Sequence, residues 1–152
     1  MSDQNYDVEQ EVEAFFTKTT VTRSTCDLHA VALVDAGLQL VPVQGACSYT
    51  VYAGATLGSV IPVIQFRLKS LALPLKTMEL AHQVYGRFAP EVAFRGQIGE
   101  DDADDGREAL LIYVMPRMQG ISRLDFILAY GFPEDTPENC NARLMLIKDV
   151  AT

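Results

Sequence analysis

The chain contains no tryptophan and only three cysteines and two histidines among its 152 residues. The cysteines, Cys26, Cys47 and Cys140, are odd in number and irregularly spaced. This pattern argues against a disulfide framework and against a zinc site built from cysteine pairs. We therefore expect reduced thiols, as in a cytoplasmic protein.

Long apolar runs and an excess of cations are also missing. No apolar stretch approaches the roughly 20 residues that cross a bilayer, and the chain begins with the acidic stretch MSDQNYDVEQEVE, unlike a secretory signal. With 12 lysines and arginines against 20 aspartates and glutamates, the net charge is −8. We expect neither a membrane nor a nucleic acid as partner, because nucleic-acid affinity depends on cations that neutralise phosphates.

Hydrophobic residues make up 49% of the sequence. A chain of this length forms one domain and buries roughly 70% of the surface that its unfolded form exposes, so it needs no disulfide. One stretch is strongly acidic, GEDDADDG at residues 99–106. Its spacing lacks the central glycine and the closing glutamate of a calcium loop, and we expect a solvated, mobile hairpin tip there.

Apolar periodicity predicts the secondary structure. Helices are expected over residues 6–16, 24–34, 77–88, 122–131 and 136–151, and strands over residues 38–43, 47–52, 60–68, 92–98 and 109–115. Pro62 predicts an edge position or a bulge for its strand. The inner face of the third helix is expected to consist of Leu80, Ala81, Val84 and Tyr85.

The predicted order from residue 38 onward is strand, strand, strand, helix, strand, strand, and then a crossing and a helix. This order predicts an α+β fold, with a five-stranded, mainly antiparallel sheet, one inserted helix and flanking helices at both ends. Residues 107–131 have the order of a kinase-type hinge: a buried strand, a tight crossing and an amphipathic helix. We expect one domain with three parts: a helical leader (1–37), the sheet (38–118), and a hinge with C-terminal helices (119–152).

Several pieces of sequence, spread over nearly the whole chain, support a closer comparison. They are FFTKTTVTRSTCDLHAVAL, QGACSYTVY, VIQFR, APEVAFRGQIG, LLIYVMPRMQGISRLDFILAYG and RLMLIKDVA. Together they resemble the fungal branch of the aminoglycoside phosphotransferase-like family. The resemblance covers only the first half of that family's architecture, and it implies a kinase-like N-lobe with ATP as its ligand.

The resemblance assigns the turn at residues 44–48, which includes Gly45 and Ser48, to the phosphates of a nucleotide, where small residues let backbone amides approach an anion. An ordinary hairpin explains the same turn. Arg67, at the end of VIQFR, falls where the resemblance places the phosphate-binding cation, with Lys69 following on the same face. The alternative for Arg67 is a strand-end cation that reaches into water.

Two further residues receive roles from the resemblance. Glu79 either pairs with Arg67, as the corresponding helix acid does in kinases, or is a first-turn acid that favours the helix dipole. Backbone groups of residues 114–117 would contact an adenine ring, and because Pro116 has no N–H, the donor must be Met115 or Arg117. A plain core strand explains this segment as well. No metal site is expected.

The sequence contains no catalytic loop. Phosphoryl transfer in this family needs an aspartate base, an asparagine and a metal-binding aspartate, all from the C-lobe. Neither His29 nor His82 is followed two residues later by an aspartate, so no catalytic residue is assigned. Such a lobe is expected to bind a nucleotide without transferring its phosphate.

Three interpretations of different classes remain. The chain is a stand-alone or truncated lobe, a pseudo-enzyme that binds a small molecule or a protein. Alternatively, it is a small enzyme that isomerises or cyclises a metabolite on the concave sheet face, with groups drawn from Tyr49, Arg67, Glu79, His82, Tyr85 and Tyr113. In the third interpretation it is a subunit that pairs with itself or with a separate C-lobe through apolar surface along residues 124–132 and the last helix. Asp27 and His29 do not share a helix face and are expected on the helix surface.

Overall fold

A computed structural model describes residues 6–54, 61–120 and 134–151. The chain forms two compact units, Met1–Arg117 and Met118–Thr152. The second unit contains the helix α5 (Pro137–Ala151), which agrees with the predicted helix over 136–151. Thr136 caps it by accepting the Asn139 N–H at 3.2 Å. The helix expected over 122–131 lies outside the described residues.

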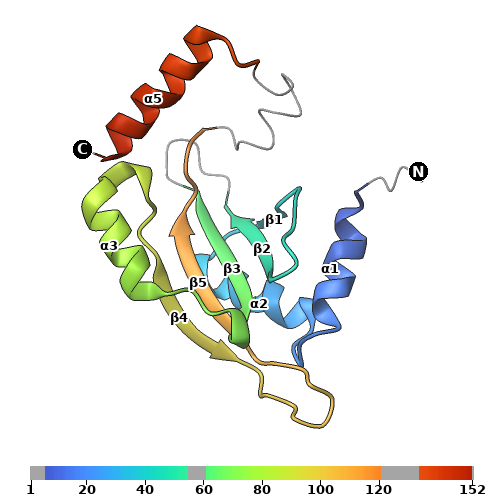
Figure 1. Cartoon of the computed structure of the whole chain (residues 1–152). Helices are drawn as coiled ribbons and strands as arrows, with labels where there is room; N and C mark the ends of the chain where they lie inside the picture. The colour runs from blue at the N-terminus through green and yellow to red at the C-terminus, as the bar shows by residue number, and fades with distance from the viewer. Residues whose placement is uncertain (1–5, 55–60, 121–133, 152) are drawn as a thin grey trace, which may run out of the picture. The chain divides into compact units, whose positions relative to one another are not determined.

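The first unit contains a five-stranded antiparallel sheet with the order β1-β2-β3-β5-β4 (Figure 1). Its strands are β1 (Leu38–Leu40), β2 (Ser48–Ala53), β3 (Pro62–Leu68), β4 (Ala93–Ile98) and β5 (Leu110–Pro116). After β3 the chain passes through η1 (Lys69–Leu71), α3 (Leu75–Tyr85) and η2 (Gly86–Phe88) before it enters β4. The predicted α+β fold with one helix inserted after the third strand is therefore confirmed.

Pro62 was expected at a sheet edge or a bulge, and the edge position is wrong. β3 lies in the interior of the sheet, between β2 and β5, and Pro62 is its first residue, opposite Pro116. Proline is tolerated at the first residue of a strand, because its missing N–H removes only a hydrogen bond at the end of the strand ladder. Beyond this pair, the Arg117 N–H still donates to the Ile61 carbonyl at 2.8 Å.

The N-terminal helices cover one face of the sheet. α1 (Val8–Phe16) and α2 (Arg23–Val34) contact β2, and α2 also contacts β1; Figure 1 shows α2 behind the sheet. The core that they form with the sheet includes Val12, Phe15, Cys26, Ala30, Tyr49, Val51, Ile64, Phe66, Leu110 and Ile112. The segment 1–37, which we expected as a leader, thus supplies part of the core. Among the described residues, no helix is long and apolar enough to cross a bilayer.

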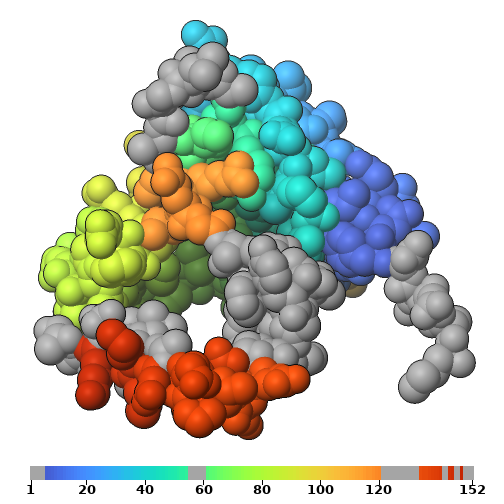
Figure 2. Space-filling model, turned by 90° about the horizontal axis from the view of Figure 1, so that it is seen from above, coloured from blue at the N-terminus to red at the C-terminus, as the bar shows by residue number. Residues whose placement is uncertain are grey.

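The expected inner face of α3 is wrong. No residue of α3 is buried, and Leu80, Val84 and Tyr85 expose 57%, 64% and 41% of their surface. The helix contacts chiefly η2, and Figure 2 shows its yellow-green surface on the opposite side of the first unit from α1. Helical periodicity identified an apolar face correctly, but it does not say what covers that face.

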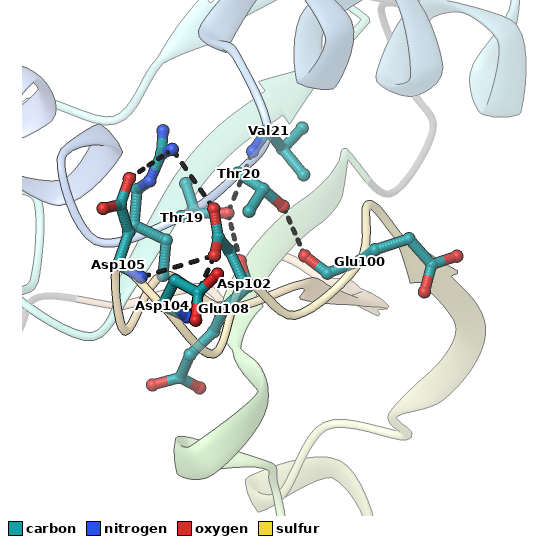
Figure 3. Close-up of polar contacts among 9 residues, drawn as sticks. Thr19, Thr20, Val21, Glu100, Asp102, Asp104, Asp105 and Glu108 are labelled. Atoms are coloured by element: carbon teal, nitrogen blue, oxygen red, sulfur yellow. Dashed lines mark hydrogen bonds and ion pairs between the residues drawn. The ribbon is translucent and has the colours of Figure 1, made fainter.

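The connection between α1 and α2 pairs with Glu108, two residues before β5, as Figure 3 shows. Thr19 forms a parallel bridge with Glu108, and its Oγ1 donates to the Glu108 carbonyl at 2.6 Å. The Glu108 N–H donates to the Lys18 carbonyl at 3.0 Å, and Thr20 Oγ1 donates to the Glu100 carbonyl at 2.7 Å. Segments almost ninety residues apart in the chain are therefore joined by both side-chain and backbone hydrogen bonds.

The acidic hairpin tip is exposed, as expected, and local bonds organise it. Asp102 Oδ1 accepts the N–H groups of Asp104 and Asp105 at 3.1 and 3.3 Å. Arg107 Nη2 reaches Asp105 Oδ2 at 2.8 Å and Asp102 Oδ2 at 3.5 Å. We did not predict these bonds from the sequence. The turn around Asp102 and the position of Arg107 opposite it both depend on the register of the hairpin.

Gly99→Ala is expected to destabilise the protein more than Gly106→Ala. Both glycines have positive φ, +76° and +65°, where any side chain costs roughly 1–2 kcal/mol. A Cβ at Gly99 would lie 2.5 Å from Val21 Cγ2, whereas one at Gly106 meets nothing within 4 Å. We expect an additional loss of about 1–3 kcal/mol for Gly99→Ala, measured by urea unfolding. Equal losses for the two variants would contradict this contact.

Candidate functional site

The predicted site residues of the sheet lie on the face opposite α1 and α2, which we call the polar face. The register across β2, β3 and β5 arranges its side chains in three rows. They are Tyr52, Val63 and Met115; Thr50, Gln65 and Tyr113; and Ser48, Arg67 and Leu111. Neighbouring rows are about 7 Å apart, since each is two residues further along the strands. The first row is apolar apart from its tyrosine hydroxyl, and the last contains the cation.

Ser48 and Arg67, predicted separately, are directly opposite each other in the β2–β3 register. Gln65 connects them: its Nε2 donates to Ser48 Oγ at 3.1 Å and to Thr50 Oγ1 at 3.4 Å, and its Oε1 accepts from Arg67 Nη1 at 3.3 Å. Arg67 Nε donates to the Leu71 carbonyl at 2.9 Å. Sequence reasoning missed Gln65 and Thr50, although each is two residues from a predicted site residue and therefore on the same face.

The turn at residues 44–48 is a hairpin closed by a glutamine side chain. Gln44 is 7% exposed; its Oε1 accepts the Thr50 N–H at 2.9 Å, and its Nε2 donates to the carbonyls of Val41 and Thr50. The Gln44 N–H donates to the Tyr6 hydroxyl at 2.6 Å, and the Ser48 N–H donates to the Gly45 carbonyl at 3.3 Å. Two amides expected to face a phosphate thus have partners inside the protein.

Glu79 does not form the expected ion pair. Among the described residues, its carboxylate accepts from Gln83 Nε2 at 3.5 Å, and neither Glu79 nor Arg67 takes part in an ion pair. The alternative role also fails, because α3 begins at Leu75 and Glu79 therefore lies in its second turn. The short connection through η1 holds Arg67 against Leu71 and away from the helix acid.

The hinge donors predicted at Met115 and Arg117 point into the sheet. The Lys69 N–H donates to the Ala109 carbonyl, and the Arg117 N–H donates to the Ile61 carbonyl. Antiparallel ladders alternate, so these two bonds turn the backbone groups of Met115 toward β3. The side chain of Met115, and not its N–H, lies on the polar face. The Pro116 carbonyl, one residue on, points away from β3 and supplies an acceptor.

Arg117 contributes to the site in a way that the sequence did not reveal. Its guanidinium carbon lies 4.3 Å from the centre of the Tyr52 ring, within the range of a cation–π contact. This contact puts a flat, charged group over the apolar row at the end of β5. No local pattern connects the two residues, because the pairing depends on the β2–β3–β5 register.

The residues proposed for a small enzyme are divided among separate places. Tyr49 lies on the core face, where its hydroxyl donates to Asp27 at 2.7 Å and burial raises its pKa. Tyr113 lies on the polar face, but its hydroxyl accepts the Leu73 N–H at 3.2 Å. His82 Nδ1 lies 2.7 Å from the Ala89 carbonyl at the end of α3. Of the strand residues in this set, Arg67 and Tyr113 share the polar face, whereas Tyr49 lies on the core face.

Asp27 is not a plain surface residue. In addition to the Tyr49 hydroxyl, it lies 4.0 Å from Arg23 Nε, and Arg23 Nη1 contacts Glu9 at 2.5 Å. The hydrogen bond that Arg23 Nη1 donates to the Glu9 carboxylate is the main reason that the pKa of Arg23 is raised. This chain of contacts joins α1, α2 and β2 on the core face. His29 is exposed and takes no part in it.

Within the part of the chain that the structure describes, no group of three or more His, Cys, Asp or Glu side chains could hold a metal ion. No protein-family model, curated protein or solved structure matches the chain significantly.

Tyr49→Phe is expected to destabilise the protein more than Tyr113→Phe. Both rings are buried, with 2% and 1% exposure, so each substitution removes one hydroxyl with little change in packing. The Tyr49 hydroxyl donates to a carboxylate, and such hydrogen bonds contribute about 1.5–3 kcal/mol, against about 0.5–1.5 kcal/mol for the neutral bond of Tyr113. Urea unfolding of both variants measures the difference. A larger loss for Tyr113→Phe would contradict the assignment.

Proposed function

We propose that this chain is a kinase-like N-lobe of the aminoglycoside phosphotransferase-like type, which binds a magnesium-complexed adenine nucleotide on its polar face and does not itself transfer phosphate. One observation carries the proposal: a cation with hydroxyl neighbours and an aromatic, apolar row lie on the same face, four residues apart along the strands. That separation is roughly 13 Å, comparable to the length of an extended nucleotide.

The phosphate end of the proposed site is organised around Arg67. The side chain is half-buried, and its bonds within the described residues use Nε and Nη1. Nη2 is the donor that remains for an anion, and a guanidinium matches the geometry of phosphate oxygens. Because no described acid neutralises Arg67, a phosphate would supply the missing negative charge.

The base end of the proposed site is formed by Tyr52, Val63 and Met115. Their side chains give an apolar surface for the face of a purine, and the Arg117 guanidinium over Tyr52 adds a planar cation that stacks on aromatic rings. The Pro116 carbonyl, which the ladder alternation turns toward β4, is proposed to accept a hydrogen bond from the exocyclic amino group of adenine. This arrangement replaces the amide donors that the hinge was expected to offer.

The topology also supports a kinase-like lobe. The sheet order β1-β2-β3-β5-β4, with a helix between β3 and β4, fits the parts that the resemblance implies. The proposal assigns magnesium to the nucleotide phosphates and no catalytic role to any residue of this chain. The base and metal ligands of phosphoryl transfer are proposed to come from outside the lobe.

Nucleotide binding is tested by thermal unfolding with increasing Mg-ATP. We expect the melting temperature of the wild type to rise with nucleotide concentration, because a ligand that binds the folded state stabilises it. Arg67→Gln should weaken binding by about tenfold or more, since hydrogen bonds to charged groups contribute about 1.5–3 kcal/mol. Arg95→Gln, at an exposed position of β4, is the matched control and should bind like the wild type.

Equal shifts in the Arg67 and Arg95 variants, or no shift at millimolar Mg-ATP, would refute the proposed site. The second half of the proposal needs its own measurement. Incubation with Mg-ATP and a panel of amino sugars and alcohols, followed by mass spectrometry, should give no product heavier by one phosphate. Such a product would show that the lobe transfers phosphate.

A second candidate function is pairing with another copy of this chain, and the exposed face of α3 favours it. Leu80, Val84 and Phe88 expose 57%, 64% and 70% of their surface along α3 and η2. The same stretch contains two cations, Lys76 and Arg87, and one acid in a chain of net charge −8. Exposed apolar surface is typical of interaction sites, and the local net charge of this stretch is positive, unlike that of the chain.

The pairing is tested by the molar mass in solution. We expect the mass of the wild type to rise with concentration toward that of a dimer, and Val84→Glu to remain a monomer because the interface would bury an unpaired charge. Leu28→Glu is the control, since Leu28 is 73% exposed on α2, away from α3. A wild type that is monomeric at every concentration would rule the pairing out.

A further inference from the structure

The middle row of the polar face lies between the two ends of the proposed nucleotide site. It consists of Thr50, Gln65 and Tyr113. Each neighbouring row is two residues further along the strands, about 7 Å away, with the apolar row on one side and the row of Arg67 on the other. In an extended nucleotide the sugar joins the base to the phosphates, so the sugar falls on this middle row.

Arg67 fixes the orientation of the Gln65 side-chain amide. A guanidinium can only donate hydrogen bonds, so the amide atom that lies 3.3 Å from Arg67 Nη1 must be the oxygen, Oε1. The amide nitrogen therefore faces β2, where it donates to Ser48 Oγ at 3.1 Å and to Thr50 Oγ1 at 3.4 Å. The reversed amide would place N–H groups against N–H groups. The cation of one row thus determines which atoms the next row presents.

This orientation leaves two hydroxyl hydrogens without a good acceptor. The oxygens of Ser48 and Thr50 both accept from Gln65. They lie 3.5 Å from each other, whereas O–H···O hydrogen bonds normally measure 2.5–3.0 Å. The hydrogen bonds between described residues give neither hydroxyl a closer acceptor. Ser48 is 5% exposed, but Thr50 is half-buried, so a ligand on the polar face can reach the Thr50 hydroxyl.

Gln65 supplies an acceptor beside this donor. A carbonyl oxygen has two lone pairs, and Oε1 uses one of them for Arg67. Oε1 and Nε2 share one carbon, so the remaining lone pair lies close to the Thr50 hydroxyl. Tyr113 takes no part, because it is 1% exposed and its hydroxyl accepts the Leu73 N–H. The middle row therefore presents one donor and one acceptor next to each other, which two adjacent hydroxyl groups can satisfy together.

We propose that Thr50 and Gln65 recognise the two adjacent hydroxyl groups of the ribose, so that the polar face selects ribonucleotides over deoxyribonucleotides. The Thr50 hydroxyl donates to one ribose oxygen, and the other ribose hydroxyl donates to Gln65 Oε1. This assignment rests on the proposed nucleotide site, because the middle row receives the sugar only when the base and the phosphates occupy the rows beside it.

The test compares the dissociation constants of Mg-ATP and of its dideoxy analogue, which lacks both ribose hydroxyls, by isothermal titration calorimetry. A neutral hydrogen bond changes affinity about 2- to 10-fold, so we expect the wild type to bind Mg-ATP about fivefold or more tightly than the analogue. Thr50→Val keeps the shape of the side chain without its hydroxyl and should reduce this preference about 2- to 10-fold. Thr50→Ser retains the hydroxyl and should keep the preference.

Thr77→Val is the matched control, since Thr77 is exposed on α3 outside the polar face, and it should keep the wild-type preference. The ratio of the two affinities is the measured quantity, so a general loss of affinity does not imitate the effect. Equal binding of both nucleotides by the wild type, or an unchanged ratio in Thr50→Val, would overturn the ribose assignment and leave the nucleotide site standing. A wild type that does not bind millimolar Mg-ATP would refute both.

Discussion

The alternation of side chains along β3 is the constraint on which the rest of this protein depends. Ile64 and Phe66 point into the core, and Gln65 and Arg67 point to the polar face. Because the side-chain period of a strand is two, a slip of one residue would bury the arginine and expose the phenylalanine. The strand is held on both sides, by β2 and β5, and the apolar core thus fixes the position of the candidate phosphate-binding cation.

The N-terminal helices matter to the polar face although they lie on the other side of the sheet. They bury the core residues of β2 and β3, and the contacts from Glu9 through Arg23 and Asp27 to Tyr49 connect both helices to β2. Tyr49 directly precedes Thr50 and follows Ser48, so its anchoring fixes the side chains that project to the opposite face. A change in α2 can therefore alter the polar face without touching it.

The sequence predicted the strands, their order and the inserted helix, because runs of β-branched residues and turn signals are local features. It named Ser48 and Arg67 separately, from the resemblance, and only the β2–β3 register puts both side chains on one face. The sequence did not predict features that depend on contacts between distant segments. These are the exposure of Leu80 and Val84 on α3, the Tyr52–Arg117 contact, and the direction of the Met115 N–H. These depend on register and on covering surfaces, which no window of sequence contains.

The end of the sheet beside the candidate base site is determined by two prolines. Pro62 and Pro116 face each other in the β3–β5 ladder. The alternation of that ladder directs their backbone nitrogens outward, toward β2 and β4. Since proline has no N–H, Pro62 gives β2 no donor and Pro116 gives β4 none at this point, whereas the β3–β5 ladder continues for one more bond, from Arg117 to Ile61. The chain then leaves the sheet with the Arg117 side chain over Tyr52. The two prolines thus mark the end of the sheet beside Tyr52, Val63 and Met115, the residues of the proposed base end.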